Sequence, residues 1–206
     1  GYGEYPAVEL VDQMGIREGE PFRAKSPYAA SKAAKELFAS VFTGLYGMDV
    51  IGLRYFNVYG RRQDPSGGYA AAIPNFITRA LRNDTIAIDG DGRQTRDFVY
   101  VSDVVQANRK ALLRDAAPSG MYNIACGERT SILGLAKMII DITGSSSQIV
   151  HGKPRAGDVR DSFADTREAR AALDYHPAYS IEQGLTETVA WYEQAVRTGG
   201  RQVTAA

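Results

Sequence analysis

A tyrosine and a lysine lie four residues apart in the stretch SPYAASKAAKEL, which runs from Ser26 to Leu37. Residues with this spacing share one face of a helix, so Tyr28 and Lys32 can point into one pocket. A phenol, with an ordinary pKa of about 10, is a poor base at neutral pH, but a neighbouring ammonium favours its ionised form. The pair is therefore a candidate acid–base couple. The alternative is a tyrosine packed at the start of a helix beside a solvated lysine, and the spacing alone does not exclude it.

The local sequence predicts the helix on which this pair lies. Ser26 is a favourable N-cap, and Pro27 occupies the first helical position. Apolar residues follow at helical spacing up to Gly47, which predicts a helix from about Pro27 to Tyr46. The next stretch, DVIGLRYFNVYG (49–60), is rich in β-branched and aromatic residues and predicts one strand that is mostly buried.

Helices and strands continue to alternate along the chain, which predicts an α/β fold. The expected helices cover residues 74–82, 102–113, 132–142, 166–173 and 181–196, and the expected strands cover TIAI (85–88) and MYNIA (121–125). The last residues, RTGGRQVTAA (197–206), are expected to form a frayed tail.

Composition limits the partners of this chain of 206 residues. Lys+Arg and Asp+Glu both number 24, so the overall charge favours neither nucleic acid nor an anionic membrane. The single cysteine, Cys126, cannot form an internal disulfide, which favours a reducing compartment such as the cytoplasm. No apolar run approaches the roughly 20 residues that span a bilayer. We expect a soluble, cytoplasmic protein without a nucleic-acid partner, a membrane partner or a metal site.

Four unusual stretches occur in a fixed order from Tyr2 to about Tyr192. They are YGE followed by SPYAASK, then LRYFNVYGRRQDP, then GDGRQTRDFVYVSDV, and finally RAGDVRDSFAD. Together they resemble the extended short-chain dehydrogenase/reductase superfamily and, within it, the nucleotide-sugar 4-epimerases. The RRQDP and GDVR forms are most similar to epimerases of UDP-N-acetylglucosamine and UDP-N-acetylgalactosamine.

The resemblance implies a reaction that uses NAD as the cofactor. In such enzymes the tyrosine, here Tyr28, removes the proton of a sugar hydroxyl while hydride passes from the same carbon to NAD. The lysine, here Lys32, also holds the nicotinamide ribose. Tyr55 matches a residue beside the nicotinamide, although a buried strand aromatic is an equally good interpretation. Return of the hydride to the other face of the keto sugar inverts the carbon and leaves NAD unchanged.

The resemblance also assigns residues to a UDP-sugar substrate. Asn57 matches an asparagine that binds the diphosphate region, and Arg96 and Arg155 match two arginines that bind the diphosphate itself. Asp158 matches a carboxylate that binds the ribose. The resemblance also makes Gln63 and Ser162 candidates for contact with the sugar. Ser162 matches a residue that lines the pocket next to the 2-substituent when the keto sugar turns over. His151 is interpreted as a structural or surface residue because the proposed chemistry already has a base.

No G-x-G-x-x-G turn for the cofactor phosphates occurs in the sequence. The resemblance therefore predicts a partial Rossmann fold, a doubly wound parallel sheet without its N-terminal half, interleaved with a smaller α/β substrate-binding domain. The remaining NAD-binding domain would cover 1–59 and 97–126, and the nucleotide-sugar domain 60–96 and 127–196. The chain is then expected to be an N-terminally truncated piece that is inactive alone. The longer link between Glu4 and Ser26 is interpreted as a surface loop.

The sequence leaves two alternative functions open and also suggests a homodimer. A dTDP-glucose 4,6-dehydratase would share the tyrosine, the lysine and NAD, and a non-catalytic nucleotide-sugar-binding protein would keep the fold alone. Related epimerases commonly form homodimers through paired helices. Apolar residues Leu37, Phe38, Val41 and Phe42 exceed what one core-facing stripe needs, as a second buried face in such a homodimer would require. A helix buried between the sheet and a lid is an equally good interpretation.

Overall fold

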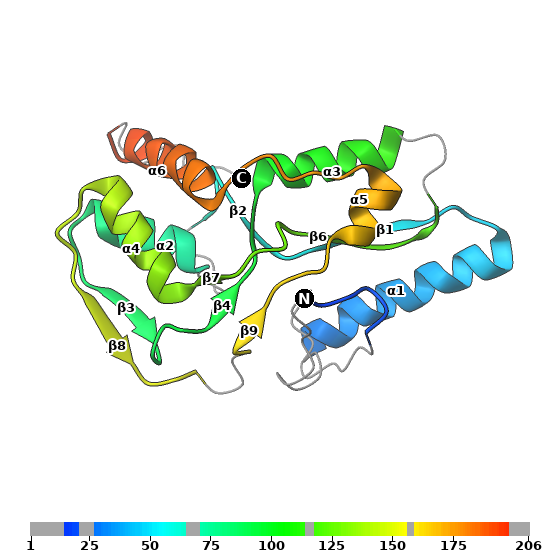
Figure 1. Ribbon diagram of the computed structural model, residues 1–206, viewed down its shortest axis with the longest axis horizontal. Helices are drawn as coiled ribbons and strands as arrows, with labels where there is room; N and C mark the ends of the chain where they lie inside the picture. The colour runs from blue at the N-terminus through cyan, green and yellow to red at the C-terminus, as the bar shows by residue number, and fades with distance from the viewer. Residues whose placement is uncertain (1–14, 21–26, 65–70, 114–117, 156–158, 198–206) are drawn as a thin grey trace. The chain divides into compact units, whose positions relative to one another are not determined.

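The computed structural model describes residues 15–20, 27–64, 71–113, 118–155 and 159–197 (Figure 1). Contacts divide the chain into two compact units. Unit 1 comprises residues 1–58, 97–129 and 161–178, and unit 2 comprises residues 59–96, 130–160 and 179–206. Residues 161–178 thus belong to unit 1 by their contacts, whereas the sequence interpretation placed them in the second domain. Which ligand each part binds stays a prediction.

Unit 1 is built around a parallel pair of strands. Strand β1 (Ile51–Tyr55) pairs with β6 (Gly120–Ile124) over all five residues, and β2 (Asn57–Tyr59) pairs with β5 (Phe98–Tyr100). The other elements are α1 (Pro27–Tyr46), α3 (Val101–Leu113), β9 (Asp161–Ser162) and α5 (Arg167–Leu173). The core lies between β6, α3 and α5 and contains Val99, Val104, Ala107, Tyr122, Ile124, Ala169, Leu173 and Tyr175.

Strand β1 separates two helices of unit 1. Successive side chains of a strand point to opposite faces of the sheet. Arg54 binds Glu36 of α1, whereas the next residue, Tyr55, donates its hydroxyl to Asn108 of α3. The two helices therefore lie on opposite faces of the β1–β6 pair, as Figure 1 shows.

Unit 2 contains two strand pairs and three helices. Its strands are β3 (Ile86–Asp89), parallel to β8 (Ile149–Gly152), and β4 (Thr95–Arg96), antiparallel to β7 (Thr130–Ser131). Its helices are α2 (Ala72–Leu81), α4 (Ile132–Thr143) and α6 (Ile181–Arg197). Helix α4 begins where Ser131 accepts a hydrogen bond from the Gly134 N–H, and it ends at Gly144, whose φ of 62° suits glycine.

The α/β fold with parallel strands is confirmed, and so is the helix over Pro27–Tyr46. The single strand predicted over 49–60 is wrong, because the chain changes partner at Phe56. The Phe56 N–H donates to Ile124 of β6 (3.1 Å), whereas the Asn57 N–H donates to Asp97 (3.1 Å). Residues of β1 are also half-buried or exposed rather than mostly buried. Within the described ranges, no helix is long and apolar enough to cross a membrane.

A buried carboxylate holds several segments of unit 1 together. The side chain of Asp97 accepts hydrogen bonds from the main-chain N–H groups of Cys126 (2.9 Å), Gly127 (2.9 Å) and Ala164 (3.1 Å). Asp97 is fully buried. Loss of hydration raises the pKa of Asp97 to about 6, although these backbone hydrogen bonds partly offset the effect.

We predict that ionisation of Asp97 makes folding less favourable between pH 4 and 7. In this range the Asp97 carboxyl binds fewer protons in the unfolded protein than in the folded protein. The contribution of the protonated carboxyl to stability is therefore present at low pH and is lost as pH rises through about 6. In Asp97→Asn the contribution is absent. The stability of the wild type relative to the variant should therefore fall with rising pH, by on the order of 2 kcal/mol.

Urea unfolding of both proteins at several pH values measures this difference. Asp141→Asn, which changes an exposed carboxylate of α4, supplies the baseline. A difference between wild type and Asp97→Asn that stays constant from pH 4.5 to 7 would contradict the prediction.

Candidate functional site

The predicted acid–base pair lies in the first turns of α1. The Nζ of Lys32 is 5.1 Å from the centroid of the Tyr28 ring, so the two side chains occupy the same side of the helix. The Tyr28 side chain is exposed (52%), and Lys32 is half-buried. The structure therefore brings together a phenol and an ammonium that an external ligand can reach. Such a pair can exchange a proton with a hydroxyl and can also bind one through hydrogen bonds.

Two further predicted residues lie at the carboxyl end of β1. Tyr55 ends the strand, and its hydroxyl donates to Asn108 (2.8 Å) on the face opposite α1. The Tyr55 side chain therefore does not join Tyr28 and Lys32. Asn57 begins β2, and its Nδ2 donates to the main-chain oxygen of Asp97 (3.0 Å). Carboxyl ends of parallel strands are the usual ligand-binding edge of α/β sheets, which is consistent with the predicted role of Asn57.

The remaining predicted substrate residues are divided between the units. Ser162 is buried in β9 of unit 1. Unit 2 holds Arg96, which is buried in β4, and Arg155, which is exposed. Unit 2 also holds Gln63, whose main-chain oxygen accepts a hydrogen bond from the Tyr192 hydroxyl. Asp158 lies outside the described residues. The roles of these residues stay predictions.

Arg54 and Glu36 were not predicted from the sequence. Arg54 donates through Nε and Nη2 to the two carboxylate oxygens of Glu36, at 2.8 and 2.6 Å. Its Nη1 donates to the main-chain oxygen of Glu18 (3.0 Å). Glu36 follows Lys32 by four residues, so the helical spacing that identified Tyr28 and Lys32 also contains the signal for Glu36.

Residues 15–20 form a short segment that packs beside β6 and β9. Gly15 has a φ of 93°, and a Cβ there would meet the backbone of Ala164 at 2.6 Å, so only glycine fits. Ile16 is buried and forms a parallel bridge with Ala164. Glu18 accepts the Asn123 N–H (2.8 Å), and burial raises the pKa of Glu18. This part of the predicted surface loop is therefore docked, and that expectation is wrong for residues 15–20.

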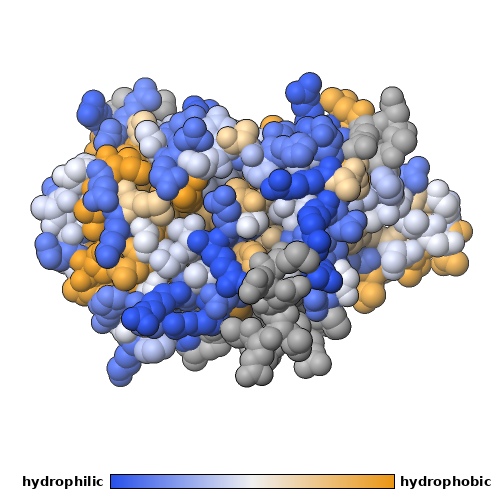
Figure 2. All heavy atoms as spheres, in the orientation of Figure 1, coloured by the Kyte–Doolittle hydropathy of each residue, from blue (hydrophilic) through white to orange (hydrophobic). Residues whose placement is uncertain are grey.

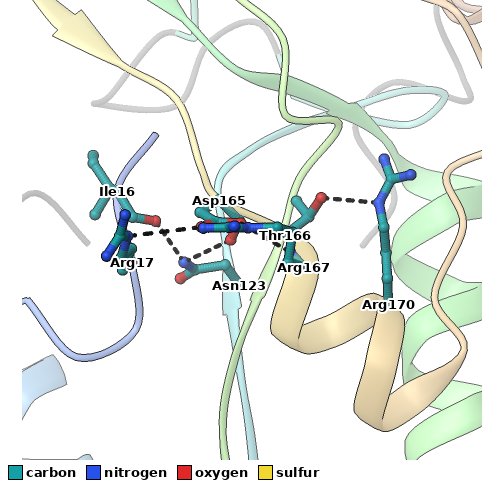
Figure 3. Close-up of polar contacts among 7 residues, drawn as sticks. All are labelled: Ile16, Arg17, Asn123, Asp165, Thr166, Arg167 and Arg170. Carbon is teal, nitrogen blue, oxygen red and sulfur yellow. Dashed lines mark hydrogen bonds and ion pairs between the residues drawn. The ribbon is translucent and has the colours of Figure 1, made fainter. Parts of the chain in front are cut away.

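Figure 3 shows the polar contacts that surround this docking. Asn123 is fully buried and donates to the main-chain oxygens of Ile16 (2.9 Å) and Asp165 (3.2 Å). The Asp165 carboxylate accepts hydrogen bonds from Arg167, which hold its pKa below the ordinary value. These side chains bind one another and the backbone, which indicates a structural role.

Nucleophilic cysteine chemistry has no candidate in this chain. Cys126 is the single cysteine, and burial raises the pKa of its thiol to about 12. The thiolate, which is the reactive form, is therefore absent at neutral pH. Among the described residues, no group of three or more His, Cys, Asp and Glu side chains could hold a metal ion.

The pair on α1 fits one end of NAD by its chemistry. The exposed Tyr28 hydroxyl and the Lys32 ammonium can both bind the hydroxyls of a nicotinamide ribose. A cation also suits the edge of a pocket in which a phenolate must be stabilised. The chemistry of Tyr28 and Lys32 is therefore compatible with a nicotinamide ribose, and this role of the pair stays a prediction.

Comparisons with known proteins agree with these features. A family model, "NAD dependent epimerase/dehydratase family", matches residues 2–125. A putative UDP-glucose 4-epimerase of Methanocaldococcus jannaschii is 38% identical over 90% of this chain and 59% of its own length. A dTDP-glucose 4,6-dehydratase of Actinoplanes is 36% identical over 88% of this chain and 56% of its own length.

Solved structures show the same likeness. The UDP-glucose 4-epimerase of Thermotoga maritima with UDP-glucose matches 91% of this chain and 60% of its own, with 38% identity and a TM-score of 0.86. The UDP-N-acetylglucosamine 4-epimerase of Methanobrevibacter ruminantium, in complex with UDP-N-acetylmuramic acid, matches 94% and 60%, with 38% identity and a TM-score of 0.85. The chain thus spans about 60% of the length of these proteins and has the corresponding part of their fold, a partial Rossmann fold.

Proposed function

The chain belongs to the NAD-dependent epimerase/dehydratase family, and from this premise we propose that the whole protein is a UDP-hexose 4-epimerase. The proposed substrates are UDP-N-acetylglucosamine and UDP-N-acetylgalactosamine. The observation that carries the proposal is the Tyr28–Lys32 pair on one side of α1, within reach of an external ligand, in a chain that is 38% identical to 4-epimerases over the matched part. A non-catalytic binding protein has little need of such a pair.

In the proposed reaction Tyr28 is the general base and general acid for the proton of the sugar 4-hydroxyl. Its phenolate accepts that proton, the ammonium of Lys32 stabilises the phenolate, and the same proton returns to the oxygen when the alcohol forms again. NAD, held by Tyr28 and Lys32, would supply the acceptor and donor of the C4 hydride. Lys32 would also hydrogen-bond the nicotinamide ribose. Because proton and hydride both return, the sugar undergoes no net oxidation. The configuration at C4 is inverted because the hydride returns to the other face of the keto sugar.

We propose that the other predicted site residues bind the substrate. Asn57 binds near the diphosphate, where its amide is held by the main chain of Asp97. The guanidinium groups of Arg96 and Arg155 bind phosphate oxygens, because the planar fork of arginine matches their geometry. Asp158 binds the ribose, and Gln63 and Ser162 contact the sugar.

A second candidate is a dTDP-glucose 4,6-dehydratase, which the 36% identity to the Actinoplanes dehydratase supports. This reaction would also begin with proton removal by Tyr28, but it would eliminate the 6-hydroxyl. Anion-exchange chromatography of the products separates the two, because a 4-keto-6-deoxy sugar nucleotide forms only in the dehydratase reaction.

We predict that Tyr28→Phe lowers kcat about 10²- to 10⁴-fold, the usual range for loss of a general acid–base group. Conversion of UDP-N-acetylglucosamine to UDP-N-acetylgalactosamine, followed by chromatography, measures the change. Tyr46→Phe is the matched control, because it removes an exposed phenol from the end of the same helix. Equal activity of Tyr28→Phe and wild type would rule out the proposed role.

Ser162 tests the preference for acetamido sugars. A small side chain at this wall leaves room for the acetamido group, whereas a bulky one excludes it and spares the plain hexoses. We predict that Ser162→Tyr lowers kcat/KM about tenfold or more for the acetamido sugars while activity on UDP-glucose persists. Because Ser162 is buried, Ser162→Val is a milder second variant. If both variants keep the wild-type ratio of activity on acetamido sugars to activity on plain hexoses, Ser162 does not determine the substrate preference.

The homodimer proposed with this function rests on α1. Its exposed side chains Leu37, Phe38, Val41, Phe42 and Leu45 form an apolar strip, here called the outer strip. Figure 2 shows apolar side chains gathered over α1. We propose that a second copy covers this strip, because water contact with five large apolar groups is unfavourable.

We predict that Phe38→Glu converts the dimer to a monomer in light scattering at micromolar concentration. The control is Leu112→Glu, which places the same charge at an exposed leucine of α3 (83%) and should leave the dimer intact. A monomeric wild type, or a dimer that survives Phe38→Glu, would remove the outer strip as the interface.

A further inference from the structure

Helix α1 makes little contact with the rest of unit 1, although it carries the proposed acid–base pair. Ala29 is the one buried residue among its twenty described residues. The outer strip is exposed, so it does not attach the helix to β1. Apolar packing within the described part of unit 1 therefore fixes the position of α1 only weakly, and directional contacts become important.

Arg54 and Glu36 make such a contact. Two parallel N–H to oxygen bonds, of 2.8 and 2.6 Å, join the guanidinium to the carboxylate. A bidentate pair of this kind fixes orientation as well as distance. Both side chains are largely shielded from water, with exposed fractions of 21% and 28%. Solvent screening is therefore weaker here than for a surface pair.

The guanidinium is itself held in place. Arg54 lies in β1, whose residues pair in register with β6, with Arg54 opposite Asn123. Its Nη1 also donates to the main-chain oxygen of Glu18 (3.0 Å). The Glu18 carboxylate in turn accepts the Asn123 N–H (2.8 Å). Glu36 is therefore bound to an arginine that strand pairing and a second hydrogen bond hold in place.

Glu36 shares its side of α1 with the proposed catalytic residues. At 100° per residue, Lys32 lies about 40° and Tyr28 about 80° around the helix from Glu36. A rotation of α1 by about 20° would move an atom about 6 Å from the helix axis by about 2 Å. Displacements of this size are large compared with the tolerance of proton transfer, since about 1 Å can cost about 10²-fold in rate.

We infer that Glu36 and Arg54 are positioning residues that set the rotation of α1 about its axis and thereby place Tyr28 and Lys32. The inference deepens the proposed function and rests on it for the roles of Tyr28 and Lys32. Neither Glu36 nor Arg54 touches the reacting atoms. Their loss changes kcat because the acid–base pair is misplaced, whereas KM changes little because the substrate-binding residues lie elsewhere.

The test uses Glu36→Gln and Arg54→Lys in the whole protein. Glu36→Gln removes the charge but keeps nearly the same shape, and Arg54→Lys keeps the charge but removes the fork. The matched control is Lys110→Met, which breaks another ion pair of unit 1, that of Lys110 with Asp174 (2.6 Å), without touching α1. We expect kcat to fall about 10- to 100-fold in both test variants with KM within about twofold, and the control to be unchanged.

A second measurement does not depend on turnover. Amide hydrogen exchange over residues 27–46 should be about tenfold faster in Glu36→Gln than in Lys110→Met, because α1 opens more often when its anchor is lost. Equal exchange rates in these two variants would overturn the inference, whatever the activity.

The outcomes separate the inference from the proposed function. If the wild type forms no epimerised product, the proposed function fails, and so does the assignment of Glu36 and Arg54 to its chemistry, while exchange still reports the attachment of α1. If the wild type is active and both test variants keep its kcat, the inference fails and the function stands. A fall in melting temperature with kcat unchanged also counts against positioning.

Discussion

The buried carboxylate of Asp97 is the interaction on which most of unit 1 depends. Its two oxygens accept hydrogen bonds from three main-chain N–H groups, two in the turn after β6 and one at Ala164, between β9 and α5. An asparagine would present one amide oxygen and an NH₂ group to the same donors, so the carboxylate is the side chain that suits the site. The main-chain oxygen of Asp97 also holds Asn57 through two hydrogen bonds. One residue thus joins the ends of β6, β9 and β2.

The burial of this charge has a cost that the neighbouring contacts reduce. A lone ionised carboxylate in an apolar interior is strongly unfavourable, and it is tolerated here because fixed N–H dipoles replace water around it. The raised pKa of Asp97 shows that the replacement is incomplete. Asp165 in the same unit has a lowered pKa because the Arg167 guanidinium supplies a full positive charge. Backbone dipoles thus hold Asp97, whereas a cation holds Asp165.

The sequence predicts features that depend on neighbouring residues and misses those that depend on distant ones. The bounds of α1 follow from Pro27 and from Gly47, whose φ of 63° ends the helix. The break at Phe56 was missed because apolar residues continue through it, and only the change of hydrogen-bond partner marks it. The helical spacing from Lys32 places Glu36 on the same side of α1, but it does not show that Arg54 is the partner of Glu36, because the two residues are far apart in sequence. The main-chain partners of Asp97 are distant in the same way. The likeness to a known family supplied candidate site residues, but not the face to which Tyr55 points.

Helix α1 has opposite requirements on its two sides. The side with Glu36 is polar and directional, because a bidentate ion pair fixes orientation as well as distance. The outer strip has no such directionality, and its large side chains suit burial against another apolar surface. A cover on the outer strip would hold α1 against the sheet without fixing its rotation. The position of Tyr28 and Lys32 is therefore set on the Arg54 side of α1, and association of two copies is set by the outer strip. A substitution on one side can then be tested without loss of the function of the other side.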